Sequence, residues 1–186
     1  MEKIKGLTLI ELIVTTAIVS AVLLIALPDL TKTVERSVLR NKTTYIKTLI
    51  QLTRSSAIKH GGLAILCALN SKGTCTENWH KGITIFVDKN NNYKLDSDDI
   101  LIRSEQVLQD TQSVKLKMSA HKNHIVYNSQ GVTHGTFGSL YFCRRNSMLS
   151  YSQKLIINRS GRVRVEFDLD QDGKVDGLTK PSTSCI

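Results

Sequence analysis

An apolar run near the start of the chain is its most informative pattern. From Leu7 to Leu27 the only charged residue is Glu11, and Pro28 follows the run directly. At about 1.5 Å per residue, a helix of this length reaches roughly 31 Å, which is enough to cross the hydrocarbon core of a membrane. A carboxylate near the start of such a helix is costly in lipid unless it meets a positive partner. We therefore expect a membrane-spanning helix that carries one functional acid.

Beyond Pro28 the apolar positions recur at helical spacing, with basic residues between them. This pattern predicts that the helix continues to about Lys59, where His60, Gly61 and Gly62 supply a stop. Because proline lacks a backbone donor, Pro28 should bend or loosen the helix. The second half of the helix is expected to pack through the apolar positions Leu30, Val34, Val38, Tyr45, Leu49 and Leu52.

The rest of the chain consists of short apolar runs bounded by turn residues, which predict β-strands. A long helix lying on antiparallel sheet is an α+β arrangement. Residues 29–186 are expected to form one globular domain that includes the second half of the helix. The expected strands are Leu63–Leu69, Ile83–Val87, Ile100–Ser104, Val114–Met118, His124–Tyr127, Leu140–Cys143, Leu155–Asn158 and Arg162–Phe167.

The formal net charge of +9 is concentrated in one segment. Between Thr111 and Val165 there is no Asp or Glu, and the other parts of the chain balance their charges. A segment of one sign attracts polyanions. Its basic residues are Lys115, Lys117, Lys122, Arg144, Arg145, Lys154, Arg159, Arg162 and Arg164.

Four cysteines, Cys67, Cys75, Cys143 and Cys185, lack the spacing of a zinc site. Beyond a membrane anchor they indicate disulfides in an oxidising compartment, the bacterial periplasm or the cell exterior. Three pairings are possible. Cys67–Cys75 would close a short local loop and Cys143–Cys185 would tie down the C-terminal tail, so we favour this pairing.

The N-terminus resembles that of type IV prepilins and type II secretion pseudopilins, through the basic leader that ends at Gly6, the apolar helix with Glu11, and Pro28. The resemblance implies that residues 1–6 are a leader, which a prepilin peptidase removes between Gly6 and Leu7, and that the new N-terminus is methylated. It also implies that residues 7–28 are the transmembrane and assembly helix, in which Glu11 pairs with the amino group of Leu7 on a neighbouring pilin. The protein would then sit in the inner membrane before assembly and in a periplasmic or cell-surface pilus afterwards. Leu7 departs from the usual phenylalanine at this position.

The globular part is similar to the FimT/GspH-type minor pilins, through Cys67…Cys75, the stretch Trp79–Asp88, Asp99–Arg103 and Ser160–Val165. This resemblance implies the type IV pilin fold, a long N-terminal helix packed on antiparallel sheet. FimT members bind DNA for uptake during natural transformation through a glycine-arginine-any-arginine pattern. That pattern falls here on Gly161, Arg162 and Arg164.

The arginine pattern also has a physical meaning of its own. Alternate side chains of a strand share a face, so Arg162 and Arg164 would lie roughly 7 Å apart on one exposed face, while Val163 and Val165 face the core. Gly161 permits a tight turn and would leave backbone N–H groups open to approach. Two guanidiniums side by side suit the phosphates of double-stranded DNA, without reading bases. The alternative is a solvated strand face that serves solubility.

Further basic residues are secondary candidates for the same interface. Lys115 and Lys117 also alternate on one face of a strand, which could belong to a different surface. The expected helpers of the arginines are Arg159, Arg144, Arg145 and Lys154.

The stretch Asp168–Asp176 matches the first nine positions of an EF-hand-type loop, with carboxylates at Asp168, Asp170, Asp172 and Asp176. Thr179 stands where the loop needs a glutamate, so any Ca²⁺ affinity should be modest; the alternative is an acidic turn beside the arginine strand. No cofactor is required by this interpretation. The stretch Asp88–Asp96 resembles the EF-hand loop less closely, and we interpret it as a polar hairpin.

No nucleophile, base and carboxylate form a catalytic pattern, so we do not expect an enzyme. The sequence favours a minor pilin that binds double-stranded DNA non-specifically for uptake. The rival hypothesis is a structural minor pilin, or a GspH-like secretion pseudopilin, that primes filament assembly without binding DNA.

Overall fold

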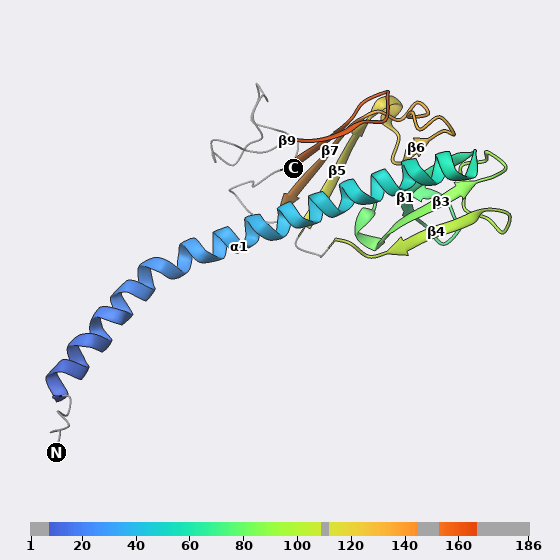
Figure 1. The fold of residues 1–186 in the computed structure, drawn as a ribbon. Helices are drawn as coiled ribbons and strands as arrows, with labels where there is room; N and C mark the ends of the chain where they lie inside the picture. Colours follow the sequence, from blue (N-terminus) through green and yellow to red (C-terminus); the bar gives the residue numbers. More distant parts are fainter. Residues whose placement is uncertain (1–7, 109–111, 145–152, 167–186) are drawn as a thin grey trace, which may run out of the picture. The chain divides into compact units, whose positions relative to one another are not determined.

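The computed structural model of the protein describes residues 8–108, 112–144 and 153–166. The chain forms two compact units, Met1–Val38 and Leu39–Ile186. Helix α1, Leu9–His60, contributes residues to both units. The expected α+β class is confirmed, with one long helix and antiparallel strands (Figure 1).

In the first unit, helix α1 begins with a side-chain cap. The backbone N–H of Glu11 donates to Thr8 Oγ1 at 3.3 Å, as expected for a threonine that caps a helix N-terminus. Glu11 lies in the first helical turn, where a negative charge is favourable. The following apolar side chains are exposed, from Leu9 at 79% to Leu23 at 50%. Nowhere in the described part of the chain is a helix both long enough and apolar enough to cross a membrane.

The C-terminal end of α1 falls at His60, in agreement with the sequence pattern. Gly61 has a φ of +67°, and its N–H donates to the carbonyl of Ile58. The N–H of Gly62 donates to the carbonyl of Ala57. Together these two bonds form a Schellman motif, in which glycine supplies the left-handed residue just past the helix end.

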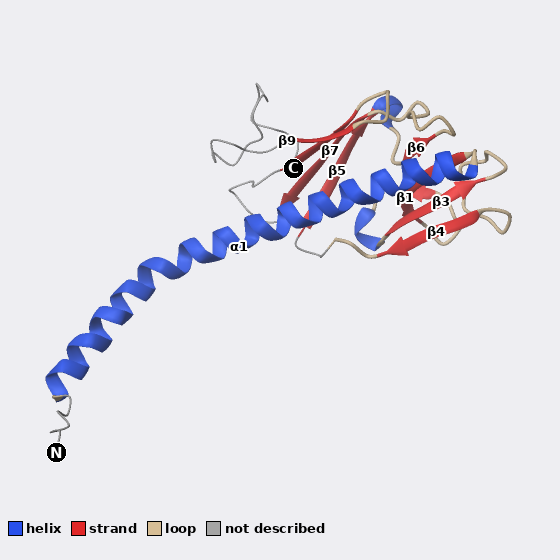
Figure 2. Ribbon diagram, viewed as in Figure 1, coloured by secondary structure: helices blue, strands red, loops and turns tan. Residues whose placement is uncertain are grey.

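Two antiparallel sheets make up the β structure of the second unit (Figure 2). The first sheet has the order β2-β1-β3-β4, with β6 also paired to β1. Its strands are β1 (Leu63–Leu69), β2 (Cys75–Thr76), β3 (Ile83–Asp88), β4 (Ile100–Glu105) and β6 (Ile125–Tyr127). The second sheet has the order β5-β7-β8-β9, with strands β5 (Gln112–Met118), β7 (Gly138–Arg144), β8 (Gln153–Ile157) and β9 (Val163–Glu166). Two short 3₁₀ turns, Trp79–Lys81 and Ser119–His121, connect strands.

Each strand expected from the sequence is present, with ends that differ by up to two residues. The sequence pattern missed β2, because two residues are too short to show a period. From Leu39 onward α1 packs on both sheets, as expected for an amphipathic helix. Val34 and Val38, which were also expected to pack, are exposed. Its buried side chains share one core with both sheets: Leu39, Ile46, Leu49, Ile50 and Ala57 from the helix, Leu66 and Ile85 from the first sheet, and Leu140, Phe142 and Leu155 from the second.

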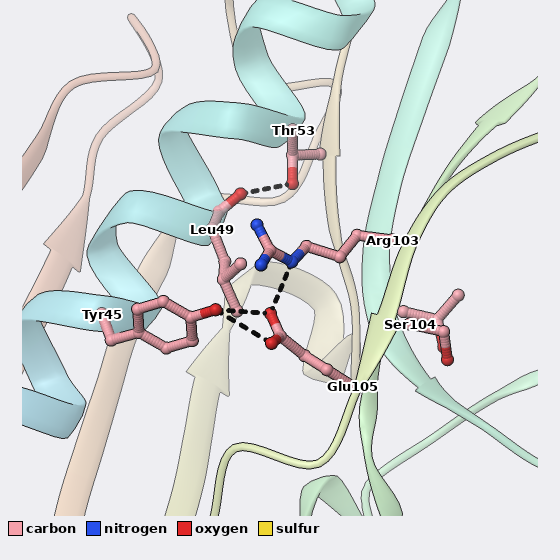
Figure 3. A network of polar contacts seen from close by, with 7 residues as sticks. Tyr45, Leu49, Thr53, Arg103, Ser104 and Glu105 are labelled. Atoms are coloured by element: carbon pink, nitrogen blue, oxygen red, sulfur yellow. Dashed lines mark hydrogen bonds and ion pairs between the residues drawn. The ribbon is translucent and has the colours of Figure 1, made fainter.

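A polar network fixes the helix to the edge of the first sheet (Figure 3). The hydroxyl of Tyr45 on α1 donates to both carboxylate oxygens of Glu105 on β4, at 2.9 Å each. Arg103 on the same strand pairs with Glu105 through its Nε at 2.9 Å. The hydrogen bond to Glu105 raises the pKa of Tyr45, because the bond stabilises the neutral phenol. The network therefore sets the position of the helix along the sheet.

The Cys67–Cys75 disulfide is present, as favoured from the sequence, and joins β1 to β2 across a separation of eight residues. Cys143 lies in β7, but its side chain and Cys185 fall outside the described residues. The Cys143–Cys185 bond therefore stays a prediction.

Candidate nucleic-acid interface

The glycine-arginine motif lies at a tight turn between β8 and β9. The N–H of Gly161 donates to the carbonyl of Asn158 at 3.0 Å, and Gly161 has a φ of +81°. The side chain of Asn158 accepts from Ser160 Oγ at 2.8 Å and from the N–H of Arg162 at 2.9 Å. This is a short hairpin loop that ends on a left-handed glycine, a geometry that the strand twist favours.

These bonds correct one expectation. The sequence suggested that Gly161 leaves backbone N–H groups open to a ligand, but the N–H groups of Gly161 and Arg162 both donate within the turn. Gly161 is itself buried. A Cβ at this position would lie 2.4 Å from the carbonyl oxygen of Gly131 and 2.8 Å from the ring of Tyr127. The glycine is therefore needed for close packing and a positive φ, and the arginine side chains are what the turn presents.

Neighbouring elements hold the turn from the core side. The Tyr127 hydroxyl on β6 donates to the carbonyl of Gly161 at 3.1 Å, and Arg54 on α1 reaches the carbonyl of Ser160 at 3.4 Å. The backbone N–H of Thr133 donates to the carbonyl of Arg159 at 3.2 Å. Burial raises the pKa of Tyr127 to about 12, so this donor keeps its proton throughout the physiological range. The turn is thereby fixed relative to the helix and the first sheet.

Arg162 and Arg164 are both exposed, and the residues between and after them pack inward. Val163 and Val165 contact the hydrophobic core, as the alternation along a strand requires. Neither arginine has an acidic partner among the described residues. β9 is an edge strand of the second sheet as far as the structure describes it.

The strand register places further basic residues on the same side of the second sheet as the arginines. Arg164 pairs with Ile156 on β8, Ile156 with Ser139 on β7, and Ser139 with Lys117 on β5. Directly opposed residues of antiparallel strands point to the same face of the sheet. Lys117 therefore shares a face with Arg164, at the other edge of the sheet.

The next row of the register runs through Lys115, Tyr141, Lys154 and Glu166. We call the side of the sheet that faces away from the helix the outer face. It carries Lys115, Lys117, Tyr141, Lys154, Arg162, Arg164 and Glu166. The sequence left open whether Lys115 and Lys117 belong to a different surface; the register joins them to the surface of the arginines.

Two of these lysines fold over the tyrosine in the middle of the outer face. The ammonium of Lys117 lies 5.0 Å from the centroid of the Tyr141 ring and that of Lys154 lies 5.9 Å from it. Lys154 also pairs with Glu166 at 2.8 Å, and its side chain is only 12% exposed. Lys154 was expected to assist the arginines, but its charge is balanced within the face. Its contribution is therefore to orient the neighbours rather than to add free charge.

The structure describes the side chain of only one of the three other basic residues that were expected to assist the arginines. Arg159 in the turn is exposed and stacks over the ring of Phe137 at 4.8 Å. Arg144 ends β7, but its side chain and all of Arg145 fall outside the described residues. Only Arg159 can therefore be placed beside the arginine motif.

A cleft of about 630 Å³ runs along the free edge of β5. Lys115, Lys117, Lys122 and His121 give it a basic lining, and Glu77 is the one acid among its described lining residues. Nothing in the sequence pattern indicated this cleft, because its walls come from segments that are distant in the chain. It extends the basic character of the outer face past the edge of the sheet.

Two loops resemble an EF-hand loop in sequence, and the structure describes one of them. Asp168, Asp170, Asp172 and Asp176 fall outside the described residues, so Ca²⁺ binding there stays a prediction. The stretch Asp88–Asp96 forms a polar hairpin in which Asp96 accepts from the amides of Asn90 and Asn92, at 2.9 and 2.7 Å. These bonds lower the pKa of Asp96. In the described part of the chain no three His, Cys, Asp or Glu side chains are grouped to hold a metal ion.

At the assembly end of the chain, Gly6 and Leu7 also fall outside the described residues. Glu11 is exposed in the first turn of α1. The capping threonine Thr8 was not singled out from the sequence, although a threonine three residues before a glutamate is a recognised helix-start signal.

Comparison with known proteins places this geometry in a family. The family model described as "Type II transport protein GspH" matches residues 43–161. Two crystal forms of the type IV minor pilin FimU from Pseudomonas aeruginosa strain PAO1 share the fold. The first has a TM-score of 0.56 at 20% identity, covering 82% of this chain and 98% of FimU. The second has a TM-score of 0.55 at 17% identity, covering 79% of this chain and 99% of FimU. No curated protein sequence matches the chain.

The FimU structures are too distant in sequence to inform more than the fold, which is that of a type IV pilin. The family match is the stronger result, since it spans well over half of the chain, from the second half of α1 to the glycine of the arginine turn. The chain therefore belongs to the GspH family of type II transport proteins and has the type IV pilin fold.

Proposed function

We propose that this minor pilin binds double-stranded DNA without sequence preference and serves DNA uptake during natural transformation. The observation that carries the proposal is the pair of exposed arginines, Arg162 and Arg164, on one face of an edge strand. Their turn is fixed by Tyr127, Arg54 and the packing of Gly161, so little ordering is needed when a phosphate arrives.

The chemistry of the two side chains suits a phosphate backbone. A guanidinium offers two parallel N–H donors to one phosphate, and two of them about 7 Å apart can hold neighbouring phosphates. Contacts of this kind position a duplex but do not select its sequence.

We also propose that the exposed apolar side chains of Leu9–Leu23 serve filament assembly and attachment to the inner membrane before assembly. In this proposal a prepilin peptidase cuts after Gly6, and Glu11 pairs with the amino group of Leu7 on a neighbouring pilin. Ca²⁺ binding by residues 168–176 is a further proposal, which a calorimetric titration of the metal-free protein would test.

The rival function is a structural subunit that primes filament assembly and does not bind DNA. The match to the GspH family favours this alternative as much as it favours the first. Both are non-enzymatic roles. They differ in what the outer face is for, so a DNA-binding measurement separates them.

The test compares the full chain in a non-ionic detergent with the variant Arg162→Gln/Arg164→Gln. Both are titrated against several duplexes of different sequence at 50 mM salt. We expect micromolar binding by the natural chain, typical of non-specific association, and a similar loss of affinity for every duplex in the variant. Circular dichroism and thermal unfolding should be unchanged, since both side chains are exposed. A folded variant that keeps its affinity would exclude the arginine site, and a natural chain that binds no duplex would favour the structural role.

A further inference from the structure

The two edges of the second sheet carry separate pairs of basic residues that point to the same side. Arg164 lies in β9 and Arg162 directly precedes this strand, and Lys115 and Lys117 lie along β5. Three inter-strand steps separate the strands, since the order is β5-β7-β8-β9. At about 4.8 Å per step, the two pairs stand roughly 14 Å apart.

We propose that duplex DNA lies across the whole outer face, and that Lys115 and Lys117 form a second phosphate-binding site opposite the arginines. The inference rests on the proposed function and deepens it, because it assigns binding residues that the arginine motif does not include. It makes the interface two-sided: one duplex is held at both edges of the sheet.

The charge balance of the outer face supports this assignment. Five basic side chains and one acid share the face among the described residues, and the acid, Glu166, is already paired with Lys154. The other basic residues of the face lie at its two edges, the arginines at the β9 edge and the lysines along β5. A polyanion that contacts one edge is attracted to the other.

Lys117 is also held in place before any ligand binds. Its ammonium lies over the ring of Tyr141, which is 93% covered. A cation fixed over an aromatic ring loses less side-chain freedom on binding than a freely moving surface lysine. Lys117 is therefore preorganised to bind a phosphate, which an ordinary solvated lysine is not.

The dimensions of B-DNA agree with the spacing of the two edges. The major groove is about 12 Å wide, so two sites roughly 14 Å apart can meet the phosphates on the two sides of one groove. The cleft beside β5 adds Lys122 and His121 beyond the lysine edge. A duplex that crosses the sheet from β9 thus continues over a basic surface.

The test is the salt dependence of DNA binding by the full chain in non-ionic detergent, using a random-sequence duplex. The variants are Lys115→Gln/Lys117→Gln and a matched control, Lys89→Gln/Lys94→Gln, which removes the same charge from the exposed loop between β3 and β4. Each phosphate contact contributes about 0.9 to the slope of log Kobs against log salt, so losing two contacts should flatten the slope by about 1.8. Over the decade from 1 M to 0.1 M salt this amounts to about 60-fold in Kobs.

We expect the β5 variant to show this flattening, the control to keep the natural slope, and Lys115→Arg/Lys117→Arg to bind like the natural chain. The arginine-substituted pair also keeps β5 charged, in case the glutamine pair self-associates through its edge. If the β5 variant keeps the natural slope while Arg162→Gln/Arg164→Gln loses binding, the second site is excluded and the proposed function stands. Equal losses in the β5 variant and the control would also exclude it. Absence of DNA binding by the natural chain overturns both proposals.

Discussion

Replacing Gly161 by alanine tests the packing that fixes the arginine turn. Two costs combine at this position. A non-glycine residue at a φ of +81° costs about 1–2 kcal/mol. The new methyl group would also lie 2.4 Å from the carbonyl oxygen of Gly131, and forced overpacking of this kind costs about 1–3 kcal/mol. We therefore expect Gly161→Ala to lower the free energy of unfolding by about 3 kcal/mol.

The assay is thermal unfolding followed by circular dichroism, with Gly61→Ala as the matched control. Gly61 has a similar φ of +67°, but no atom lies within 4 Å of a Cβ built there. The control should therefore show the backbone cost alone, about 1 kcal/mol. For a domain of this size, about 3 kcal/mol lowers Tm by roughly 6–12 °C and about 1 kcal/mol by roughly 2–4 °C. Equal shifts in the two variants would refute the close packing of Gly161 against the Gly131 carbonyl.

Three further outcomes follow from the same structure. Removing the disulfide by Cys67→Ala/Cys75→Ala opens a loop of eight residues and should cost about 2.5 kcal/mol in the chain-entropy treatment, measured by urea unfolding against the oxidised natural chain. Burial, aided by Lys122, lowers the pKa of His124, so the unfolded chain binds a proton more readily. Stability should then fall as the pH drops below about 6.5, and a His124→Gln variant that keeps the full decline would show that another group causes it. In an absorbance titration of the tyrosine phenols, Tyr127 should stay neutral until about pH 12. If a Tyr127→Phe variant still shows a phenol that ionises near pH 12, another tyrosine is responsible.

The sequence was sufficient for most of the fold because the signals involved are local. The extent of α1 followed from helical spacing and from the glycines at its end, and the strands followed from short apolar runs. The inward direction of Val163 and Val165 followed from alternation along one strand. The first disulfide was favoured because its two cysteines are close in the chain.

The candidate interface required contacts that no local pattern contains. Lys117 and Arg164 lie in one row only because β5, β7, β8 and β9 pair in a particular register, which is set by residues far apart in the chain. The pairing of Lys154 with Glu166 is likewise a cross-strand contact. The role assigned to Gly161 was wrong in part for the same reason, since its neighbours Gly131 and Tyr127 come from other segments.

The arginine motif thus combines two separable roles. Gly161 is required by the fold, whereas Arg162 and Arg164 can be changed without disturbing the core. A variant that loses DNA binding through Gly161 would be ambiguous, because the turn itself would move. Substitutions of the two arginines address binding alone.

The most direct test of DNA binding by the outer face is an NMR titration of the protein, ¹⁵N-labelled at arginine, with a short duplex. We predict that the side-chain Nε signals of Arg162 and Arg164 shift together with one apparent Kd and return when the salt is raised. Arg103, which pairs with Glu105 on the other sheet, should stay unchanged and serves as the internal control. Shifts confined to Arg103 or to other arginines, or no shift of Arg162 and Arg164 at low salt, would contradict the assignment of this face to DNA.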